Sequence, residues 1–523
     1  MGAVTINKFF LSGLTGILLA ISFPFSGSLT PFIFIAWIPL FAVALQLKDQ
    51  RRGALKFFGF SYLAVLLFNI ITTWWIWNST AGGALMAFIC NSLLMAGALC
   101  LGFLIFRSLH SFLFLLGICL SWISFEFLHL NWELSWPWLT MGNYFSVHPL
   151  WVQWYEFTGI LGGSFWVMGL NLLLTAIIFK LASKKALIYA SAILLLVPFI
   201  ASVILAHQHR PMAKHQQRVL LMQPNIDPYT EKFNTDPAVQ VESMLAMVRP
   251  YLHDALVIGP ETALQEAFIE RDYTQTKSSK LIADALAPNH CFMLIGASTF
   301  EVFEQKNSSA SKLMENGLYY ESYNTALFTD GKQHEFIHKS KLVLGVEKIP
   351  FSQWLPFLEE WSINNGGTSG SLGVEKEPKI FNNGNQAYAP IICYESIYGA
   401  FVAEQCRKGA QLLCIITNDG WWGDTPGHRQ HNQFAALRAI ETRKYVVRSG
   451  NTGISSVWNS KGQCVKSLGY NKKGVLTAKV PLLTEKTFYV RHGDYVGWLS
   501  ILALLGLVGV RISYRKLNPT TQR

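Results

Sequence analysis

Long apolar stretches dominate the first 206 residues of the chain, and one further stretch lies near its carboxyl end. Each stretch is long enough to cross a bilayer as a helix, which takes about 20 residues. The pattern therefore predicts a polytopic α-helical membrane domain over 1–206, a closing span over 494–510 and a tail over 511–523. The eight predicted spans are approximately 9–25, 30–47, 57–76, 84–106, 112–130, 157–179, 186–206 and 494–510.

From about residue 215 to 490 the pattern changes to short apolar runs that end abruptly in polar residues. Ala255 to Ile258, for example, precedes Gly259-Pro260-Glu261. Segments with helical spacing, such as Asp236 to Val248, lie between several of these runs. Short buried strands that alternate with helices predict a globular α/β domain over 215–490. The predicted strands are 219–222, 255–258, 292–295, 336–337, 389–392 and 412–416.

The composition agrees with this division of the chain. The 523 residues are 51% hydrophobic and 14% charged, and the mean hydropathy of +0.28 excludes a purely water-soluble protein. Residues 1–206 contain 9 Lys or Arg and 4 Asp or Glu, whereas the rest of the chain contains 34 and 28. The charged residues are therefore concentrated in the predicted globular domain.

The basic residues of the membrane domain are distributed on one side only. Every Lys and Arg within 1–206 lies before the first predicted span or in the connections that follow the second, fourth and sixth spans. Cytoplasmic connections are the ones enriched in these residues. We therefore expect both termini in the cytoplasm and residues 207–493 on the far side of the membrane. The net charge of +11 is then no indication of nucleic-acid binding.

Three chemically different side chains follow predicted strands of the globular domain: Glu261, Lys339 and Cys393. Because reacting groups of open α/β sheets collect at the carboxyl ends of strands, we expect the three to converge. Each also has a structural explanation. Glu261 is placed to cap a helix beginning near Thr262, Lys339 to be a solvated surface lysine, and Cys393 to be a small buried residue.

A thiol, a carboxylate and an ammonium group together suit acyl transfer. A free thiol is mostly protonated at neutral pH, so a neighbouring carboxylate such as Glu261 is needed as a base. The attack leaves negative charge on the former carbonyl oxygen. The ammonium group of Lys339 and the backbone N–H of Tyr394, next to Cys393, are the predicted donors to that oxyanion.

Four segments resemble one known family. They are Gly259-Pro260-Glu261-Thr262, His338-Lys339 through to Glu347, Cys393-Tyr394-Glu395, and Thr417-Asn418-Asp419-Gly420-Trp421-Trp422-Gly423-Asp424. Together they resemble apolipoprotein N-acyltransferase, the membrane-bound branch of the nitrilase superfamily, over essentially the whole chain. The resemblance implies an extracytoplasmic nitrilase-like αββα sandwich. It also implies Glu261 as general base, Lys339 as oxyanion stabiliser and Cys393 as nucleophile, with Glu347, Tyr394 and Glu395 supporting them.

The sequence departs from the family pattern at two places. Leu344-Gly345-Val346 stands where the family usually has Pro-Phe-Gly, and Phe233 stands near a usual Trp. An apolar segment over 351–361, beside a Gly/Ser-rich stretch over 364–373, is predicted either as a mobile flap that admits lipid or as a packed helix and loop. The predicted lipid entrance consists of Phe233, Trp354, Phe357, Trp361, Trp421 and Trp422.

The resemblance implies a complete reaction and its setting. A phospholipid, expected to be phosphatidylethanolamine, gives an acyl chain to Cys393, and the N-terminal amine of a diacylglyceryl-cysteine lipoprotein then takes it from the thioester. The implied site is periplasmic, on a bacterial inner-membrane protein, and uses no metal ion, cofactor or nucleic acid. Two alternatives stay open: a membrane-tethered amidase that gives the thioester to water, and a transporter. The transporter is disfavoured because Glu126 is the clearest ionisable residue within the spans.

Overall fold

The computed structural model describes residues 7–213, 215–232, 234–349 and 371–517. These residues form two compact units. The first, a helical unit, comprises the described residues of 1–77, 81–208 and 492–523, and the second, a globular unit, comprises those of 78–80 and 209–491. Phe233, Trp354, Phe357 and Trp361 of the predicted lipid entrance lie outside the described residues.

The helical unit contains seven helices that are long and apolar enough to cross a membrane. They are Thr30–Leu47, Gly53–Thr73, Ala81–Phe106, Ser111–His129, Ile160–Ile178, Lys184–Gln208 and Tyr495–Tyr514. The first predicted span falls on α1, Lys8–Ser22, whose 15 residues cover only about 22 Å. α1 packs closely on α3, since a Cβ on Gly16 would lie 2.5 Å from Ala64 O. The described residues therefore form eight spans if α1 crosses the membrane and seven if it does not.

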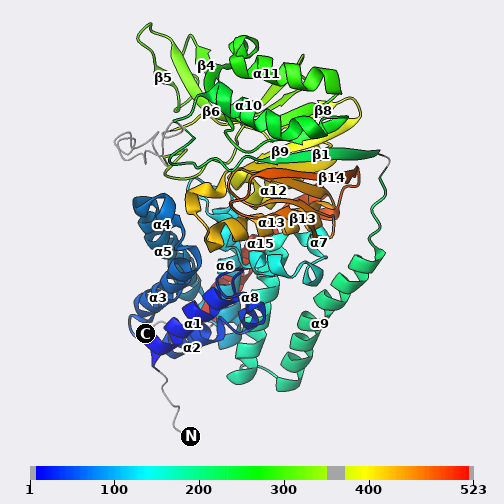
Figure 1. Ribbon diagram of the computed structural model, residues 1–523. Helices are drawn as coiled ribbons and strands as arrows, with labels where there is room; N and C mark the ends of the chain where they lie inside the picture. Colours follow the sequence, from blue (N-terminus) through cyan, green and yellow to red (C-terminus); the bar gives the residue numbers. More distant parts are fainter. Residues whose placement is uncertain (1–6, 214, 233, 350–370, 518–523) are drawn as a thin grey trace. The chain divides into compact units, whose positions relative to one another are not determined.

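The helices of this unit that follow α1, including those that form the candidate spans, can be followed by their colour along the chain in Figure 1. They are η1 Thr30–Phe34, α2 Ile38–Leu47, α3 Gly53–Thr73, α4 Ile76–Ser79, α5 Ala81–Phe106, α6 Ser111–His129, η2 Pro137–Leu139, η3 Met141–Val147, η4 Pro149–Trp151, α7 Tyr155–Thr158, α8 Ile160–Ile178, α9 Lys184–Gln208 and α15 Tyr495–Leu517.

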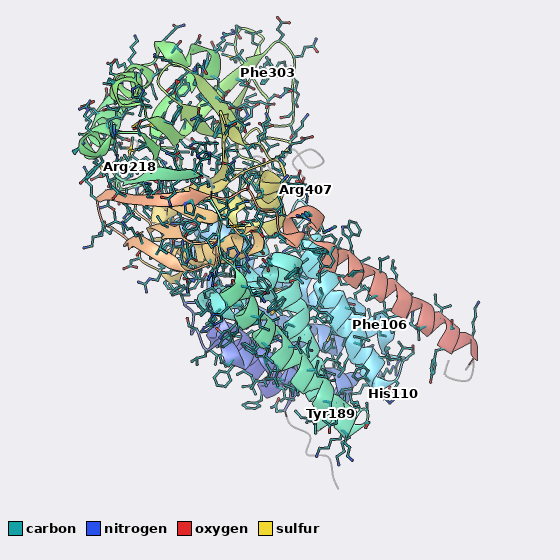
Figure 2. The ribbon with its side chains drawn as sticks, turned by 90° about the vertical axis from the view of Figure 1, so that its right-hand side faces the viewer. Phe106, His110, Tyr189, Arg218, Phe303 and Arg407 are labelled. Carbon is teal, nitrogen blue, oxygen red and sulfur yellow. The ribbon has the colours of Figure 1, made fainter. Side chains whose placement is uncertain are left out.

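Two basic connections of the helical unit lie at the same end. Lys48 Nζ donates to Ser111 Oγ at 3.4 Å, and Arg107 donates to Gln50 O at 3.4 Å. Figure 2 shows Tyr189, near the start of α9, toward the same end as Phe106 and His110. The connections that carry Lys and Arg are thus on one side of the unit, as the sequence pattern requires.

The globular unit is built on two sheets. One has eight strands, in the order β14-β1-β2-β4-β6-β5 with β3 beside β4 and β7 beside β6, and the other has the order β13-β12-β11-β10-β9-β8. The strands of the first are β1 His215–Gln223, β2 Ala255–Ile258, β3 Leu264–Ile269, β4 Phe292–Phe303, β5 Lys312–Leu313, β6 Tyr319–Thr329, β7 His334–His338 and β14 Gly474–Leu482. Those of the second are β8 Phe381–Asn383, β9 Gln386–Ile392, β10 Leu412–Thr417, β11 Tyr445–Gly450, β12 Ser455–Trp458 and β13 Cys464–Leu468.

Successive side chains of each strand point to opposite faces of its sheet. Each sheet can therefore pack on the other sheet with one face and on helices with the other, which gives four layers. In β1, Val219 and Leu221 point into the core between the two sheets, while Leu220 and Met222 point to the outer side. There they pack on α10, Pro237–Val248, and α11, Lys277–Leu286. The second sheet is covered by α12, Gly399–Arg407, and α13, Pro426–Thr442 (Figure 1). The unit is therefore the αββα sandwich that the sequence predicted. Its remaining short helices are η5 Arg249–Tyr251, η6 Glu270–Gln275, η7 Ala287–Asn289, η9 Cys393–Ile397, η10 Asp419–Trp422 and α14 Phe488–His492.

The strand directions bring several carboxyl ends to one edge of the sandwich. β1, β2 and β4 are parallel, and β7 has the same direction because it pairs antiparallel with β6, which is antiparallel to β4. In the second sheet β9, β10 and β11 are parallel. Residues that follow β2, β7, β9 and β10 can therefore meet.

Candidate active site

Glu261 and Lys339 meet in a buried ion pair. Lys339 Nζ lies 2.9 Å from Glu261 Oε1 and 2.9 Å from Glu347 Oε1. The side chain of Lys339 is 1% exposed and those of both glutamates are 8% exposed. Lys339 is thus no solvated surface lysine. Glu261 caps no helix either, because Thr262 has a φ of +46° and strand β3 follows.

Cys393 follows β9 and adjoins this pair. It is buried, and its φ of +51° turns the chain sharply out of the strand. Burial raises the pKa of its thiol well above the usual value; the charge of Glu261 raises it further, and that of Lys339 lowers it. The structure therefore brings together all three residues that the sequence singled out.

Asn324, in the middle of β6, holds the two carboxylates together. Its Nδ2 donates to Glu261 Oε1 at 2.8 Å and to Glu347 Oε1 at 2.9 Å, and its backbone carbonyl oxygen accepts from the backbone N–H of Lys339 at 2.8 Å. Asn324 was not among the predicted site residues. It lies among other polar residues of β6, so its sequence context does not distinguish it.

The charges of this cluster reinforce one another. Burial raises the pKa of Glu261, but Lys339 and the hydrogen bonds from Lys339 and Asn324 outweigh burial and hold that pKa below its usual value. Burial likewise lowers the pKa of Lys339, but Glu261 and Glu347 together hold it well above its usual value. Glu261 is therefore ionised and can accept a proton, while Lys339 remains a cation.

Glu395, the predicted supporting carboxylate, ties two loops of the site. Its Oε1 accepts from the backbone N–H of Ser340 at 2.6 Å, and its Oε2 accepts from that of Ile392 at 2.8 Å. Burial raises the pKa of this carboxyl to about 7. Neighbouring Tyr394 is also buried and packs edge-to-face on Tyr398. Glu395 therefore fixes the segment after β7 relative to the end of β9.

Comparison with known proteins covers both units. The apolipoprotein N-acyltransferase N-terminal domain matches residues 15–173, and the carbon-nitrogen hydrolase domain matches residues 221–487. The apolipoprotein N-acyltransferase of Chlorobaculum tepidum is 30% identical over 532 residues, which covers 97% of each chain. The chain belongs to the apolipoprotein N-acyltransferase family.

The chain is also similar to a second full-length relative and to a solved structure. The apolipoprotein N-acyltransferase of Geobacter metallireducens is 26% identical over 515 residues, covering 95% of this chain and 94% of its own. Among solved structures, Nit3 of Saccharomyces cerevisiae, a nitrilase-superfamily member, matches with a TM-score of 0.37 and 14% identity over 60% of this chain and 97% of that one. The two family models and the full-length relatives confirm the family resemblance, and they confirm the combination of apolar helices with a nitrilase-like α/β domain.

A second lysine lies beside the site in this member of the family. Lys232 is 5% exposed, its Nζ donates to Thr262 Oγ1 at 2.5 Å, and it lies 5.8 Å from the centre of the Trp421 ring. Burial lowers its pKa to about 8, although Glu261 and Cys393 act in the other direction. Trp421 and Trp422, from the predicted lipid entrance, are both partly exposed. Sequence analysis did not predict the buried lysine.

Two groups of side chains have the composition of a metal site: Cys393 with Asp419 and His431, and Glu270 with Glu301 and His338. In the first, Asp419 is already bound by Arg448 and by His431. In the second, His338 bonds directly to Glu270 at 2.8 Å. Among the described residues, the histidine of each group therefore already has a carboxylate partner, and the expectation of a site without metal or cofactor stays a prediction.

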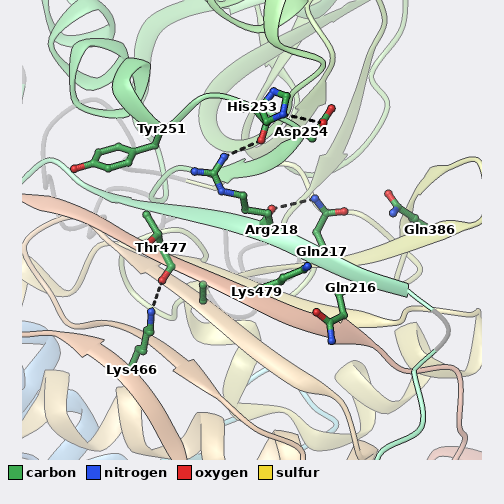
Figure 3. A pocket seen from close by; sticks show the side chains of 11 residues that line it. Gln216, Gln217, Arg218, Tyr251, His253, Asp254, Gln386, Lys466, Thr477 and Lys479 are labelled. Atoms are coloured by element: carbon green, nitrogen blue, oxygen red, sulfur yellow. Dashed lines mark hydrogen bonds and ion pairs between the residues drawn. The ribbon is translucent and has the colours of Figure 1, made fainter.

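A separate hollow of about 640 Å³ lies at the other edge of the sandwich (Figure 3). Its lining includes residues at the amino-terminal ends of β1, β2 and β9, such as Arg218, Asp254 and Gln386, together with Lys466 of β13 and Thr477 to Lys479 of β14. Arg218 donates to His253 O at 2.8 Å there. The lining contains no thiol, so this hollow is not the centre that the three predicted residues form.

Proposed function

We propose that this protein transfers a fatty acyl chain from a phospholipid to the N-terminal amine of a diacylglyceryl-cysteine lipoprotein. The buried contact of Lys339 with Glu261 and Glu347 beside Cys393 carries the proposal. It supplies a base, a cation and a nucleophile in one place, in a chain whose relatives along its whole length are named for this activity. Glu261, Lys339 and Cys393 are the proposed catalytic residues.

In the first half of the reaction Cys393 attacks the ester carbonyl of the phospholipid. Glu261 takes the thiol proton, and the carbon–sulfur bond forms while the carbonyl oxygen becomes an oxyanion next to the ammonium group of Lys339. The carbon–oxygen bond of the ester then breaks. Glu261 returns the proton to the departing oxygen, and lysophospholipid leaves an acyl thioester on Cys393.

In the second half the lipoprotein amine attacks the thioester. An α-amino group has a pKa near 7.7 to 8.0, so an appreciable fraction is neutral at neutral pH. The new carbon–nitrogen bond forms as the carbon–sulfur bond breaks. Glu261 takes a proton from the nitrogen and returns it to the sulfur of Cys393. The depressed pKa of Glu261 suits a group that must be ionised at the start of each half.

The membrane spans follow from the substrates. Drawing an acyl chain out of a bilayer costs about 0.8 kcal/mol per CH₂, so the enzyme must work where the tails stay in lipid. We propose eight spans including α1, both termini in the cytoplasm, and the globular unit in the periplasm of the bacterial inner membrane. The one-sided Lys and Arg distribution supports this orientation. Phosphatidylethanolamine is the proposed donor.

The proposed entrance for lipid lies around Trp421 and Trp422. Both indoles are partly exposed, and aromatic rings of this kind favour the boundary between lipid and water. Phe233, Trp354, Phe357 and Trp361 are proposed to belong to the same entrance. The segment over 351–361, the predicted flap, lies outside the described residues.

The decisive experiment is an intact-mass measurement of the purified protein after incubation with phosphatidylethanolamine alone. We expect a gain of one fatty-acyl mass, released by neutral hydroxylamine as a thioester is. Adding a diacylglyceryl lipopeptide with a free amine should then remove the mass and acylate the peptide. Loss of the added mass to water at the same rate with and without the peptide would favour the membrane-tethered amidase instead.

A further inference from the structure

The backbone of Cys393 is held in an unusual conformation. Its φ of +51° is left-handed, and residues with a Cβ rarely adopt that region. Such a conformation persists only where surrounding contacts fix it. Since β9 ends at Ile392 and the short helix η9 begins at Cys393, these contacts decide where the thiol points.

Two buried side chains contact the carbonyl oxygen of Cys393. Ser396 Oγ donates to it at 2.7 Å. His431 Nε2, from α13, lies 3.1 Å from the same oxygen and 2.9 Å from Ser396 Oγ. Because a carbonyl oxygen only accepts hydrogen bonds, Nε2 of His431 carries a hydrogen and donates it.

The other ring nitrogen of His431 faces Asp419, which follows β10. Nδ1 lies 2.9 Å from Asp419 Oδ1 and 3.2 Å from Arg448 Nη2. Asp419 also accepts from Thr417 Oγ1 at 2.7 Å and from the guanidinium group of Arg448. Burial raises the pKa of Asp419, but Arg448 and His431 hold it far below the usual value. Asp419 and Arg448 therefore hold the ring from the nitrogen opposite the one that contacts Cys393.

We propose that His431 is a positioning residue for Cys393. Asp419 and Arg448 fix the ring, and its Nε2–H fixes the carbonyl of Cys393 and so the direction of the thiol. Cys393 Sγ and the ligand atoms of Asp419 and His431 lie within 4.8 Å of one another, so a shift of the ring reaches the thiol directly. This role rests on the proposed acyl-enzyme function and extends it.

The test measures the alkylation of Cys393 by iodoacetamide in the full-length detergent-solubilised protein across pH 6 to 10, followed by peptide mass spectrometry. His431→Gln has no second nitrogen for Asp419 to hold, so it should lower the rate by about 2- to 10-fold at neutral pH, the effect of one hydrogen bond, and should lower acyl-enzyme formation in parallel. His428→Gln is the matched control. His428 is equally buried, lies one turn earlier in α13 and bonds Asp424 at 3.0 Å, so that variant should alkylate normally.

The outcomes separate this role from the proposed function because alkylation uses no lipid. A folded His431→Gln variant, judged by an unchanged melting temperature, that alkylates at the normal rate would overturn the positioning role. If His431→Gln does not fold, Ser396→Ala decides, because it removes the hydroxyl that contacts both His431 Nε2 and the carbonyl of Cys393: slower alkylation supports the role and an unchanged rate refutes it. Slower alkylation of His431→Gln in a protein that never forms an acyl-enzyme would retain the role and reject acyl transfer.

Discussion

Lys339 Nζ lies 2.9 Å from Glu261 Oε1, and the side chain that carries it is 1% exposed. Replacing a buried ion pair by apolar residues is often neutral for stability, so this pair is poorly explained as a stabilising device. A base that must be ionised in a dry site needs a cation beside it, and an oxyanion needs one too. One ammonium group in contact with Glu261 serves both purposes.

Lys339→Met should therefore reduce acyl transfer by about 10² or more, the cost of one oxyanion donor. Because it leaves Glu261 and Glu347 buried without their cation, it should also lower the free energy of unfolding by about 3 to 5 kcal/mol. The burial of Lys339 thus adds a stability cost to the loss of activity. The measurements are the acyl-enzyme rate and urea unfolding.

A second variant separates the two effects of Lys339. The double variant Lys339→Met/Glu347→Gln removes one of the two carboxylate charges that are left without a cation. Much of the lost free energy of unfolding should therefore return, while the rate of acyl transfer stays low. Recovery of both together would mean that Lys339 acts only in folding. Lys312, which is exposed on β5, provides the matched control as Lys312→Met and should change neither quantity.

Asn324→Leu should shift the acid limb of the rate–pH profile toward higher pH. Glu261 has a depressed pKa, so its ionised form persists below the usual range of a glutamate, and Asn324 contributes to that depression through the 2.8 Å hydrogen bond. Removing the donor raises the pKa, and more of the base is protonated at a given acidic pH. Single-turnover acylation between pH 4 and 8 measures the shift, and an unmoved acid limb would separate Asn324 from the base.

Lys232→Met should remove a pH dependence of stability on the alkaline side. The pKa of Lys232 is about 8 in the folded protein against an ordinary 10.5, so the unfolded chain binds more protons between these values. Stability conferred by this residue therefore rises as pH increases from about 8 to 10.5. Below pH 8 both states are protonated, and burial of the charge opposes folding.

The measurement is the melting temperature of wild type and variant from pH 7 to 10.5. Lys444 offers a companion, because burial also lowers its pKa to about 8. Lys232→Met and Lys444→Met should each show a smaller rise in melting temperature between about pH 8 and 10.5 than the wild type shows. Parallel curves for wild type and Lys232→Met would mean that Lys232 keeps an ordinary pKa.

Much of the sandwich could be predicted from the sequence, because the apolar runs indicate which segments are buried. The run 255–258 coincides with β2, and the segment from Asp236 coincides with α10, whose first turn Asp236 caps by accepting from Ala238 N at 2.8 Å. β14 was not predicted. Its residues are largely half-exposed and it is defined by antiparallel pairing with β1, a contact that the local pattern does not record.

The role of Asn324 could not be predicted from the sequence, because it depends on hydrogen bonds between residues far apart in the chain. Asn324 also lies in β6, where the polar residues Glu321 and Thr325 obscure the strand pattern.

The predicted span over 30–47 is interrupted between η1 and α2, and a contact with a distant residue makes this possible. Asn171 of α8 donates to Ile33 O and accepts from Trp37 N, both at 2.9 Å, and so satisfies backbone groups that a continuous helix would satisfy itself.

The orientation of the protein can be tested with reporter fusions. A fusion after Lys185 should report the cytoplasm and one after His215 should report the periplasm, because the Lys and Arg residues of the helical unit lie on one side. A fusion in the connection near Gly27 should also report the periplasm, because six predicted spans separate Gly27 from His215. Opposite results at Gly27 and His215 would mean that one of these six spans does not cross the membrane.

Cys393→Ala should neither gain an acyl mass from phosphatidylethanolamine nor acylate a lipopeptide amine, because the proposed route passes through a thioester on that sulfur. Cys406 and Cys464 are the controls. Cys406 is buried in α12, and Cys464 is exposed on β13. Their Ala variants should acylate at close to the normal rate, with at most a modest packing loss at Cys406. If Cys393→Ala still acylated the amine, direct attack of the amine on the phospholipid ester would replace the covalent route. Glu261 would then remain as base, and Lys339 would still bind the oxyanion.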